Sequence, residues 1–215
     1  MKARKKRLLV TAGPTREHLD PVRFLSNASS GKMGYAIAKA ALKLGWEVNL
    51  VSGPVALECP DGVNLCRVTS AQEMYDSVDR LFDFCDCFIA VAAVSDWRPA
   101  TTEPEKVKKD GSPQTLELVP TTDILASMAS RKSDSQIIVG FCAETNQLET
   151  HARSKLAAKN LDWIAANFVG AADGGFESDN NEILLMGSNG ARHVLGPDSK
   201  QKVGAELLAK VLVAG

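Results

Sequence analysis

Strand-length apolar runs alternate with amphipathic, helix-length stretches through most of the chain, and this alternation restricts the fold more than any other feature. The runs lie at residues 7–13 (RLLVTAG), 47–54, 63–69, 87–94, 137–144 and 162–167. Several are almost continuously apolar, which is typical of strands covered on both faces. Strand and helix in alternation predict right-handed crossovers and a doubly wound, mostly parallel α/β sheet, in which ligands bind at the carboxyl ends of the strands.

The helices are predicted from apolar residues that recur with helical spacing. Between Met33 and Leu44 the apolar residues fall on one face, and Gly45 suits the end of that helix. Ser70 and Glu73 form the capping box of a second helix. The remaining helices are expected at residues 122–130, 148–159 and 202–213.

Two polar segments interrupt the alternation. Residues 97–114 (WRPATTEPEKVKKDGSPQ) are rich in proline and lysine without apolar periodicity, so we expect a mobile flap loop. Residues 170–181 are expected to form a second loop, which leads into a strand at 182–186 and a short C-terminal β-hairpin around 187–192. Residues 1–215 are therefore predicted to form a single domain with one flap.

The charge and cysteine content exclude several classes of protein. The formal net charge is −1, so overall electrostatics predict neither a nucleic acid partner nor an acidic membrane. The five cysteines are odd in number and lack metal-ligand spacing, which indicates reduced thiols in a cytoplasmic protein. No segment approaches 18 consecutive apolar residues, as a membrane-spanning helix requires.

The stretch SSGKMG, before the first helix, carries groups that can bind an anion. Ser29, Ser30, Gly31, Lys32 and Gly34 offer hydroxyls, exposed amides and one ammonium at a helix N-terminus. A phosphoryl site is one interpretation, and glycines that permit close packing of helix on sheet are the other. The Walker pattern of P-loop proteins is absent, because Met33 stands where that pattern has Ser or Thr.

Taken together, DPVRFLSNASSGKMG, AAVSDWRP, PEKVKK, VGFCAET and ARSKLAAKNLD resemble the phosphopantothenoylcysteine synthetase family, a ligase of coenzyme A biosynthesis. The resemblance implies a Rossmann-like fold, a homodimer, and CTP in preference to ATP, with Mg²⁺. It also implies the reaction: 4'-phosphopantothenate attacks the α-phosphate of CTP, and the acyl-cytidylate is captured by the amine of cysteine. The products would be CMP and pyrophosphate. No metal ligand from the protein is assigned.

The resemblance also implies roles for individual residues. Asn27 would handle the acyl-nucleotide and Lys106 of the flap would cover the triphosphate, so both are expected to be catalytic. Arg23 would reach the substrate phosphate from a neighbouring subunit. The other expected substrate-binding residues are Ser30, Gly31, Lys32, Ala92 and Ala93. The expected nucleotide-binding residues are Gly13, Asp96, Lys106, Asp123, Ile124, Leu125, Ala126, Phe141, Lys155 and Lys159.

Two other functions compete with the ligase. An NAD(P)-dependent reductase would carry an acidic or basic residue at the end of the second strand to address a ribose, whereas that strand ends in VSGP. The other alternative is a catalytically silent nucleotide-binding module, because many family members are fused to a flavin-dependent decarboxylase. Such a decarboxylase is also a possible partner of an active enzyme.

Overall fold

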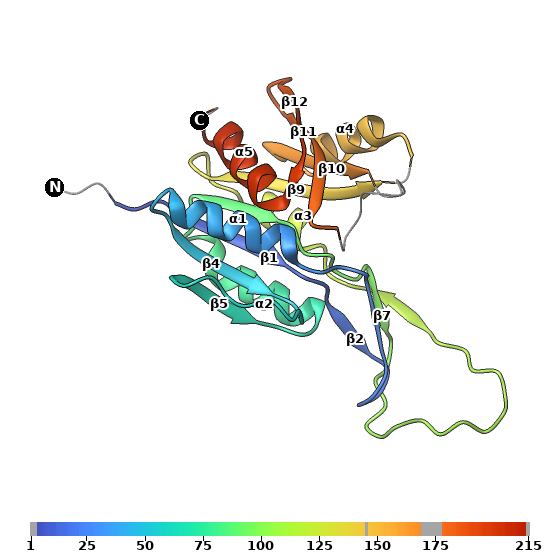
Figure 1. The fold of residues 1–215 in the computed structure, drawn as a ribbon. Helices are drawn as coiled ribbons and strands as arrows, with labels where there is room; N and C mark the ends of the chain where they lie inside the picture. The colour runs from blue at the N-terminus through green and yellow to red at the C-terminus, as the bar shows by residue number, and fades with distance from the viewer. Residues whose placement is uncertain (1–3, 145, 169–177, 214–215) are drawn as a thin grey trace.

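The computed structural model describes residues 4–144, 146–168 and 178–213, and its centre is an eight-stranded sheet in the order β12-β11-β10-β9-β6-β1-β4-β5 (Figure 1). The strands that pair in parallel are β1 (Arg7–Ala12), β4 (Glu47–Ser52), β5 (Val63–Arg67), β6 (Cys87–Ala90), β9 (Ile137–Glu144) and β10 (Trp163–Phe168). The mostly parallel, Rossmann-like sheet predicted from the alternation is thus confirmed.

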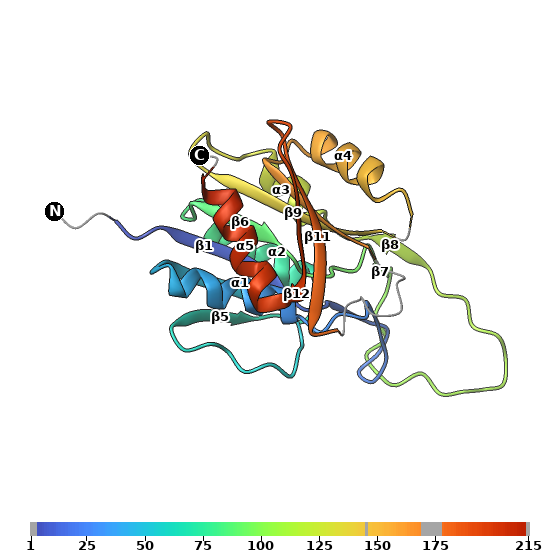
Figure 2. The same cartoon turned by 45° about the horizontal axis from the view of Figure 1, so that its top comes forward.

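Helices cover both faces of the sheet (Figures 1 and 2). One face carries α1 (Lys32–Lys43) and α5 (Lys200–Val213), and the other carries α2 (Ala71–Phe82), α3 (Ile124–Ala129) and α4 (Leu148–Ala158). Alternate residues of β1 serve the two cores, since Leu8 and Val10 pack with α1 and α5 while Leu9 packs with α2. Each fully buried leucine of this kind stabilises the fold by about 1.5–3 kcal/mol.

The C-terminal hairpin is larger than the sequence suggested. The strands β11 (Asn180–Gly187) and β12 (Arg192–Ser199) each span eight residues, and β11 pairs antiparallel with β10. The hairpin therefore extends the main sheet by two long strands. The helix that follows it begins at Lys200, two residues before the predicted start. Of the polar loop expected at 170–181, residues 170–177 lie outside the described part, and Asn180 already belongs to β11.

Four short strands form a second structure, which we call the arm. It consists of β2 (Arg16–His18) paired with β3 (Phe24–Ser26), β7 (Trp97–Pro99) paired with β8 (Leu118–Pro120), and the loop 100–117. The expectation of an uninterrupted flap loop at 97–114 was wrong at its start, because residues 97–99 are a strand and the loop runs on to 117. In both views the arm extends away from the main sheet (Figures 1 and 2).

The two halves of the arm are joined at the turn between β2 and β3. The amide of Glu103 donates to the carbonyl of Leu19 at 2.9 Å, and the Thr102 hydroxyl donates to the carbonyl of His18 at 3.0 Å. The side chain of Asp20 is fully buried, and its Oδ2 accepts the amide of Val107 at 3.3 Å. The loop 100–117 is thus attached to the hairpin from which Arg23 projects.

The remaining sequence-based expectations concern helix ends, cysteines and membrane spans. The Ser70 side chain accepts the Glu73 amide at 3.2 Å, which confirms Ser70 as the N-cap of α2, and Gly45 follows the C-cap of α1 with φ +80°. All five cysteines are free thiols. No helix in the described residues is both long and apolar enough to cross a membrane.

Candidate active site

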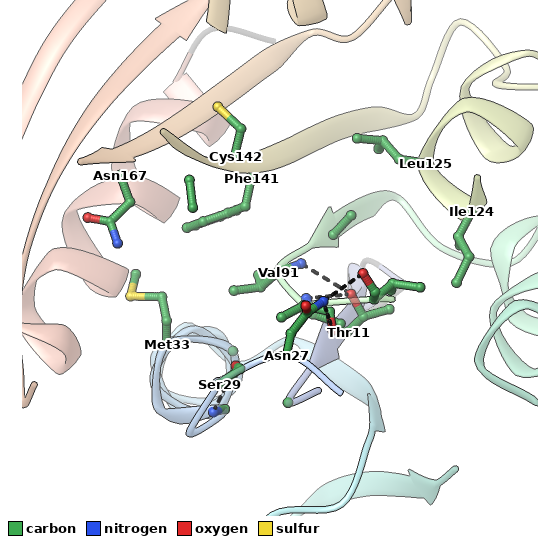
Figure 3. A pocket seen from close by; sticks show the side chains of 18 of the residues that line it. Thr11, Asn27, Ser29, Met33, Val91, Ile124, Leu125, Phe141, Cys142 and Asn167 are labelled. Atoms are coloured by element: carbon green, nitrogen blue, oxygen red, sulfur yellow. Dashed lines mark hydrogen bonds between the residues drawn. The ribbon is translucent and has the colours of Figure 1, made fainter. Parts of the chain in front are cut away.

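The main pocket lies at the carboxyl ends of β1, β6 and β9, where the order of the strands reverses. The chain leaves β1 towards β4 and β5 on one side and returns to β6 and β9 on the other, so the loops after β1 and β6 diverge. Such a switch point is where doubly wound sheets bind ligands. The cavity has a volume of about 630 Å³, which suits a nucleotide-sized molecule. Figure 3 shows side chains from these strands and from the start of α1 around it.

Threonine hydroxyls fix the segment that follows β6 as one wall of the pocket. The Oγ1 of Thr11 accepts the amides of Val91 and Ala92, each at 3.1 Å. Further along the chain, the Oγ1 of Thr15 accepts the amide of Ser95 at 2.9 Å. These bonds hold the segment beyond β6 against the loop after β1, so that Ala92 lines the cavity with its small side chain.

Asn27 lies at the centre of this wall (Figure 3). Its Nδ2 donates to the carbonyl oxygens of Ala93 at 3.2 Å and Val94 at 3.0 Å. A carboxamide carries both donors and an acceptor, and here its donor end is oriented by two backbone carbonyls. The sequence prediction that Asn27, Ala92 and Ala93 share one site is consistent with this arrangement, since all three line the pocket.

The entrance to α1 is built from close backbone contacts. Gly31 is the N-cap of α1 with φ +74°, a left-handed conformation that glycine adopts without strain, and it has no side chain of its own to cap the helix. A Cβ at Gly34 would lie 2.6 Å from the Cβ of Ala12, so this glycine lets α1 approach β1. The close-packing interpretation of SSGKMG thus applies to Gly34. Ser29, Ser30, Gly31 and Lys32 line the pocket, and a phosphoryl site there stays a prediction.

Paired charges form the opposite end of the pocket. Lys155 Nζ lies 2.7 Å from Oε1 of Glu144, and Lys159 Nζ lies 2.7 Å from Oδ2 of Asp123. The hydrogen bond from Lys155 lowers the pKa of Glu144, while burial opposes that shift. Burial disfavours ionisation of Asp123, but the hydrogen bonds from Lys159 and from the amide of Ala126 outweigh it, and the pKa of Asp123 lies below its ordinary value. Both lysines are thus held in place beside the cavity by carboxylates.

Asp123 also has a structural role at the start of α3. Its Oδ1 accepts the amide of Ala126 at 2.9 Å, so Asp123 is the N-cap of α3. Ile124 and Leu125 at the start of α3 line the pocket, and Phe141 of β9 lines it from the sheet (Figure 3). Ala126 is a predicted nucleotide-binding residue that does not line the cavity, because its amide is turned towards the cap.

Arg23 and Lys106 do not reach this cavity either. For Arg23 this position is consistent with the expectation that it serves a neighbouring subunit, which stays a prediction. Arg23 donates through Nε and Nη2 to Oδ2 of Asp20, at 2.9 Å and 2.5 Å, and its side chain is 51% exposed. Lys106 is exposed in the loop 100–117. Neither residue lines the pocket of its own chain. The remaining predicted residues, Gly13 and Asp96, do line it.

Several polar residues that line the pocket were not predicted as site residues. Among them are Thr11, Thr121, Thr122, Asn167, Asn181 and Lys200. Thr11 and Asn167 lie inside apolar strands, so no local pattern marks them. Asn181 was assigned to the polar loop before the C-terminal hairpin but belongs to β11, and Lys200, placed before the last helix, is the first residue of α5. A hairpin that extends the sheet brings these two residues to the cavity.

The fold and the pocket define a Rossmann-like α/β protein whose first helix begins, with a glycine- and serine-rich segment, at a switch point of its sheet. Comparison with known proteins narrows this class. The family described as "DNA/pantothenate metabolism flavoprotein C-terminal domain" matches residues 3–214. The coenzyme A biosynthesis bifunctional protein CoaBC of Vibrio vulnificus is 48% identical over 208 residues, which cover 96% of this chain and 52% of that protein.

Solved structures agree with these sequence matches. The crystal structure of the C-terminal domain of a coenzyme A biosynthesis bifunctional protein CoaBC superposes with a TM-score of 0.83 at 40% identity, covering 97% of this chain and 95% of that one. A Cab2 mutant in complex with phosphopantothenate-cysteine superposes with a TM-score of 0.79 over 97% of this chain and 86% of that one, and at 18% identity it shows a shared fold alone.

The chain belongs to the family described as "DNA/pantothenate metabolism flavoprotein C-terminal domain" and is a domain of the phosphopantothenoylcysteine synthetase type. The resemblance inferred from its five motifs is therefore confirmed. The chain spans about half the length of the CoaBC relative it matches.

Proposed function

We propose that this domain is a phosphopantothenate–cysteine ligase that activates 4'-phosphopantothenate with CTP. The observation that carries the proposal is the convergence of four separate motifs on one cavity: the SSGKMG entrance, Asn27, the Ala92–Ala93 wall and the Lys155–Lys159 end. The relatives act in coenzyme A biosynthesis by name, and the Cab2 structure holds phosphopantothenate-cysteine.

The residues of the pocket suit a reaction in which the protein supplies no nucleophile. The substrate carboxylate attacks the α-phosphate and the cysteine amine then attacks the acyl-nucleotide, so the protein aligns reactants, neutralises charge and excludes water. The oriented carboxamide of Asn27 would hold the activated acid, and the basic residues would face the phosphates. The buried Cys142 beside the cavity is a poor nucleophile, because burial raises the pKa of its thiol to about 11.

Mg²⁺ would enter with the nucleotide. Phosphate oxygens and water are the ligands that Mg²⁺ prefers, and it commonly binds through substrate phosphates. Among the residues that the structure describes, no group of three His, Cys, Asp or Glu side chains is placed to hold a metal ion. We therefore assign its coordination to the triphosphate and none of its ligands to the chain.

We also propose that the active enzyme is a homodimer in which the arm serves the partner's site. Arg23 and Lys106 lie outside the pocket of their own chain, and the arm exposes apolar side chains, among them Val22 at 57% and Trp97 at 52%. A second copy would cover this surface and receive Arg23. A flavin-dependent decarboxylase that supplies or consumes intermediates of the same pathway is the further partner suggested by the family resemblance.

The ligase activity is tested by pyrophosphate release. Purified protein with Mg²⁺ should release pyrophosphate when CTP, 4'-phosphopantothenate and cysteine are all present, and replacing CTP by ATP should slow the reaction. Release that does not depend on 4'-phosphopantothenate would contradict the proposal. Absence of release with all three substrates would favour the silent module instead. The reductase gains no support, because Ser52 ends β4 where a ribose-binding acid would lie.

The role of a second copy is tested by complementation. Arg23→Ala and Asn27→Asp proteins should each be nearly inactive alone, and a mixture exchanged under mild denaturation should regain activity, because one site of each mixed dimer then has both residues intact. If Arg23 acted within its own chain, no mixture would exceed the sum of the two separate proteins. Light scattering gives the oligomeric state independently.

A further inference from the structure

Lys200 is a buried cation in the wall of the pocket, and neither the predicted site nor the family motifs include it. It is the first residue of α5, only 6% of its surface is exposed, and it lines the cavity together with Lys32 and Asn181. Lysine is among the residues least often buried, because its ammonium loses hydration when it leaves water. A lysine retained at such a position next to a cavity calls for a function.

The surroundings of Lys200 increase the free-energy cost of burying its ammonium. Lys32 is the first residue of α1, so both lysines stand at helix N-termini, where the positive end of the helix dipole disfavours a cation. Burial lowers the pKa of Lys200, and repulsion from Lys32 lowers it further, more than attraction by Asp179 raises it. The ammonium of Lys200 is therefore destabilised at the place where it lines the pocket.

Asp179 links the two lysines at the edge of the pocket. Its Oδ1 lies 2.6 Å from Nζ of Lys32, and its carbonyl accepts the backbone amide of Lys200 at 2.9 Å. The side chain of Asp179 is 87% exposed, so water screens its charge strongly. An anion bound inside the cavity would face both lysines with less screening than this surface carboxylate does.

We propose that Lys200 is a substrate-binding residue that, together with Lys32, holds a phosphoryl group of a bound substrate. The inference rests on the proposed ligase function and extends it to the C-terminal helix. Two substrates of that reaction carry such a group, 4'-phosphopantothenate and the nucleoside triphosphate, and both would present oxygens that accept from an ammonium. A structural role for Lys200 is the competing explanation, and the two explanations predict opposite changes in stability.

The test compares Lys200→Met with the matched control Lys202→Met in the full chain. Lys202 lies on the same helix, its side chain is 63% exposed, and it pairs with Asp198 outside the cavity. Thermal unfolding of the ligand-free proteins comes first. A binding lysine is a destabilising charge in the empty pocket, so Lys200→Met should unfold at the same temperature as the wild type or higher. If Lys200 had a mainly structural role, Lys200→Met would unfold at a lower temperature than the wild type.

Binding is then measured by calorimetry with 4'-phosphopantothenate alone and with CTP and Mg²⁺ alone, without cysteine. A charge-assisted hydrogen bond is worth roughly a ten- to hundredfold change in affinity. We expect Lys200→Met to weaken binding of one of the two substrates by about tenfold or more, Lys200→Arg to restore most of it, and Lys202→Met to match the wild type. The substrate whose affinity falls identifies the source of the phosphoryl group.

The possible outcomes separate this inference from the proposed function. If Lys200→Met binds both substrates within about twofold of the wild type, or if the wild type binds neither, the inference is overturned. If the wild type is active but Lys200→Met binds both substrates normally, the proposed ligase function holds and the role of Lys200 is overturned. If substrate affinity depends on Lys200 but the wild type releases no pyrophosphate, the binding role of Lys200 holds and the proposed ligase function is overturned.

A second measurement applies if Lys200→Met does not fold. The wild-type lysines are methylated with ¹³C-formaldehyde under reducing conditions, and the Lys200 signal is assigned from its loss in Lys200→Arg. A bound phosphoryl group should raise the pKa at which this signal titrates. A signal that does not move when saturating 4'-phosphopantothenate or CTP is added would overturn the proposal.

Discussion

In the pocket, the functional side chains are held by the main sheet, whereas in the arm they are held by a few contacts between exposed loops. Asn27 donates to two carbonyls of a segment that is itself fixed by Thr11 and Thr15. Lys106 belongs to a loop whose attachments to the β2–β3 hairpin include the Glu103 amide, the Thr102 hydroxyl and the Val107 amide.

This difference indicates two ways of preparing a site. The pocket is preorganised, so that a ligand meets groups already in position, which is the condition for strong electrostatic stabilisation of a reaction. The arm projects its cations from a small structure outside the cavity, so their use depends on a second copy or on closure around the ligand. The comparison makes predictions that can be checked by substitution.

The largest effect is expected at Asn27. In Asn27→Asp a carboxylate would face the carbonyl oxygens of Ala93 and Val94 in place of the donor that now binds them, and it would repel the substrate carboxylate. Loss of one preorganised group commonly costs a hundredfold to a thousandfold in rate, so we expect kcat to fall by about 10³. Steady-state pyrophosphate release measures it. Circular dichroism should show an unchanged fold, and a variant with normal turnover would remove Asn27 from the mechanism.

The next largest effect is expected at Lys106 in the arm. Lys106→Gln removes a cation expected to meet the triphosphate as charge develops, so kcat should fall by about a hundredfold, or about 3 kcal/mol, while the affinity for CTP changes little. Lys108→Gln in the same exposed loop is the control and should stay within about 0.5 kcal/mol of the wild type. Equal effects of the two variants would mean that the arm contributes only general positive charge.

A smaller effect, on stability, is expected at Gly31. An alanine there would carry φ +74° and place its Cβ 2.9 Å from Cγ1 of Val55, so Gly31→Ala should lower the free energy of unfolding by about 1–2 kcal/mol or more. Urea denaturation measures this. Gly111 in the arm is the control, since it has φ +88° and open space around it. Gly111→Ala should leave the urea midpoint nearly unchanged, because strain there can relax within the loop.

The smallest change in global stability is expected at Asp20, where the effect should be local and dependent on pH. The side-chain hydrogen bond from Arg23 holds the pKa of Asp20 well below its ordinary value. Its contacts are therefore complete above the unfolded-state pKa of about 3.9 and are lost as the pH falls through the lower folded-state pKa. Asp20→Asn should increase hydrogen exchange of the Glu103 and Val107 amides at neutral pH without shifting the urea midpoint much.

Lowering the pH provides the control for this prediction. The difference in exchange between wild type and Asp20→Asn should be constant from pH 7 to about pH 5 and should shrink below about pH 4, as the wild-type carboxyl becomes protonated. A difference that stayed constant down to pH 2 would show that the carboxylate charge does not attach the loop to the hairpin.

Much of the fold could be predicted from the sequence, because the main sheet depends on local patterns. Continuous apolar runs predicted the parallel strands, and the Ser70 cap placed the start of α2 correctly. The arm could not be predicted in the same way, since its three-residue strands are too short to show a period of two. Neither could the length of the C-terminal strands, where Asn180 and Asn181 are polar residues in a strand that the sheet, not local propensity, stabilises.

The residues of the candidate site also fall into two groups, those that local motifs predicted and those that only the fold brings to the cavity. The family motifs contain Asn27, Lys32, Phe141 and Lys155, and these residues do line the cavity. Lys200 lies outside every motif. Only the antiparallel pairing of β11 with β10 brings the start of α5 beside the start of α1.

By itself, then, the sequence determined the doubly wound sheet, the helix entrance rich in glycine and serine, and the family. Each of these depends on contiguous residues with a regular period or a fixed spacing. The tertiary structure alone decided that Lys106 lies outside the cavity of its own chain and that Lys200 lines it. The physical reason is that strand order and long-range pairing set distances between segments far apart in the chain, and no local pattern of residues encodes those distances.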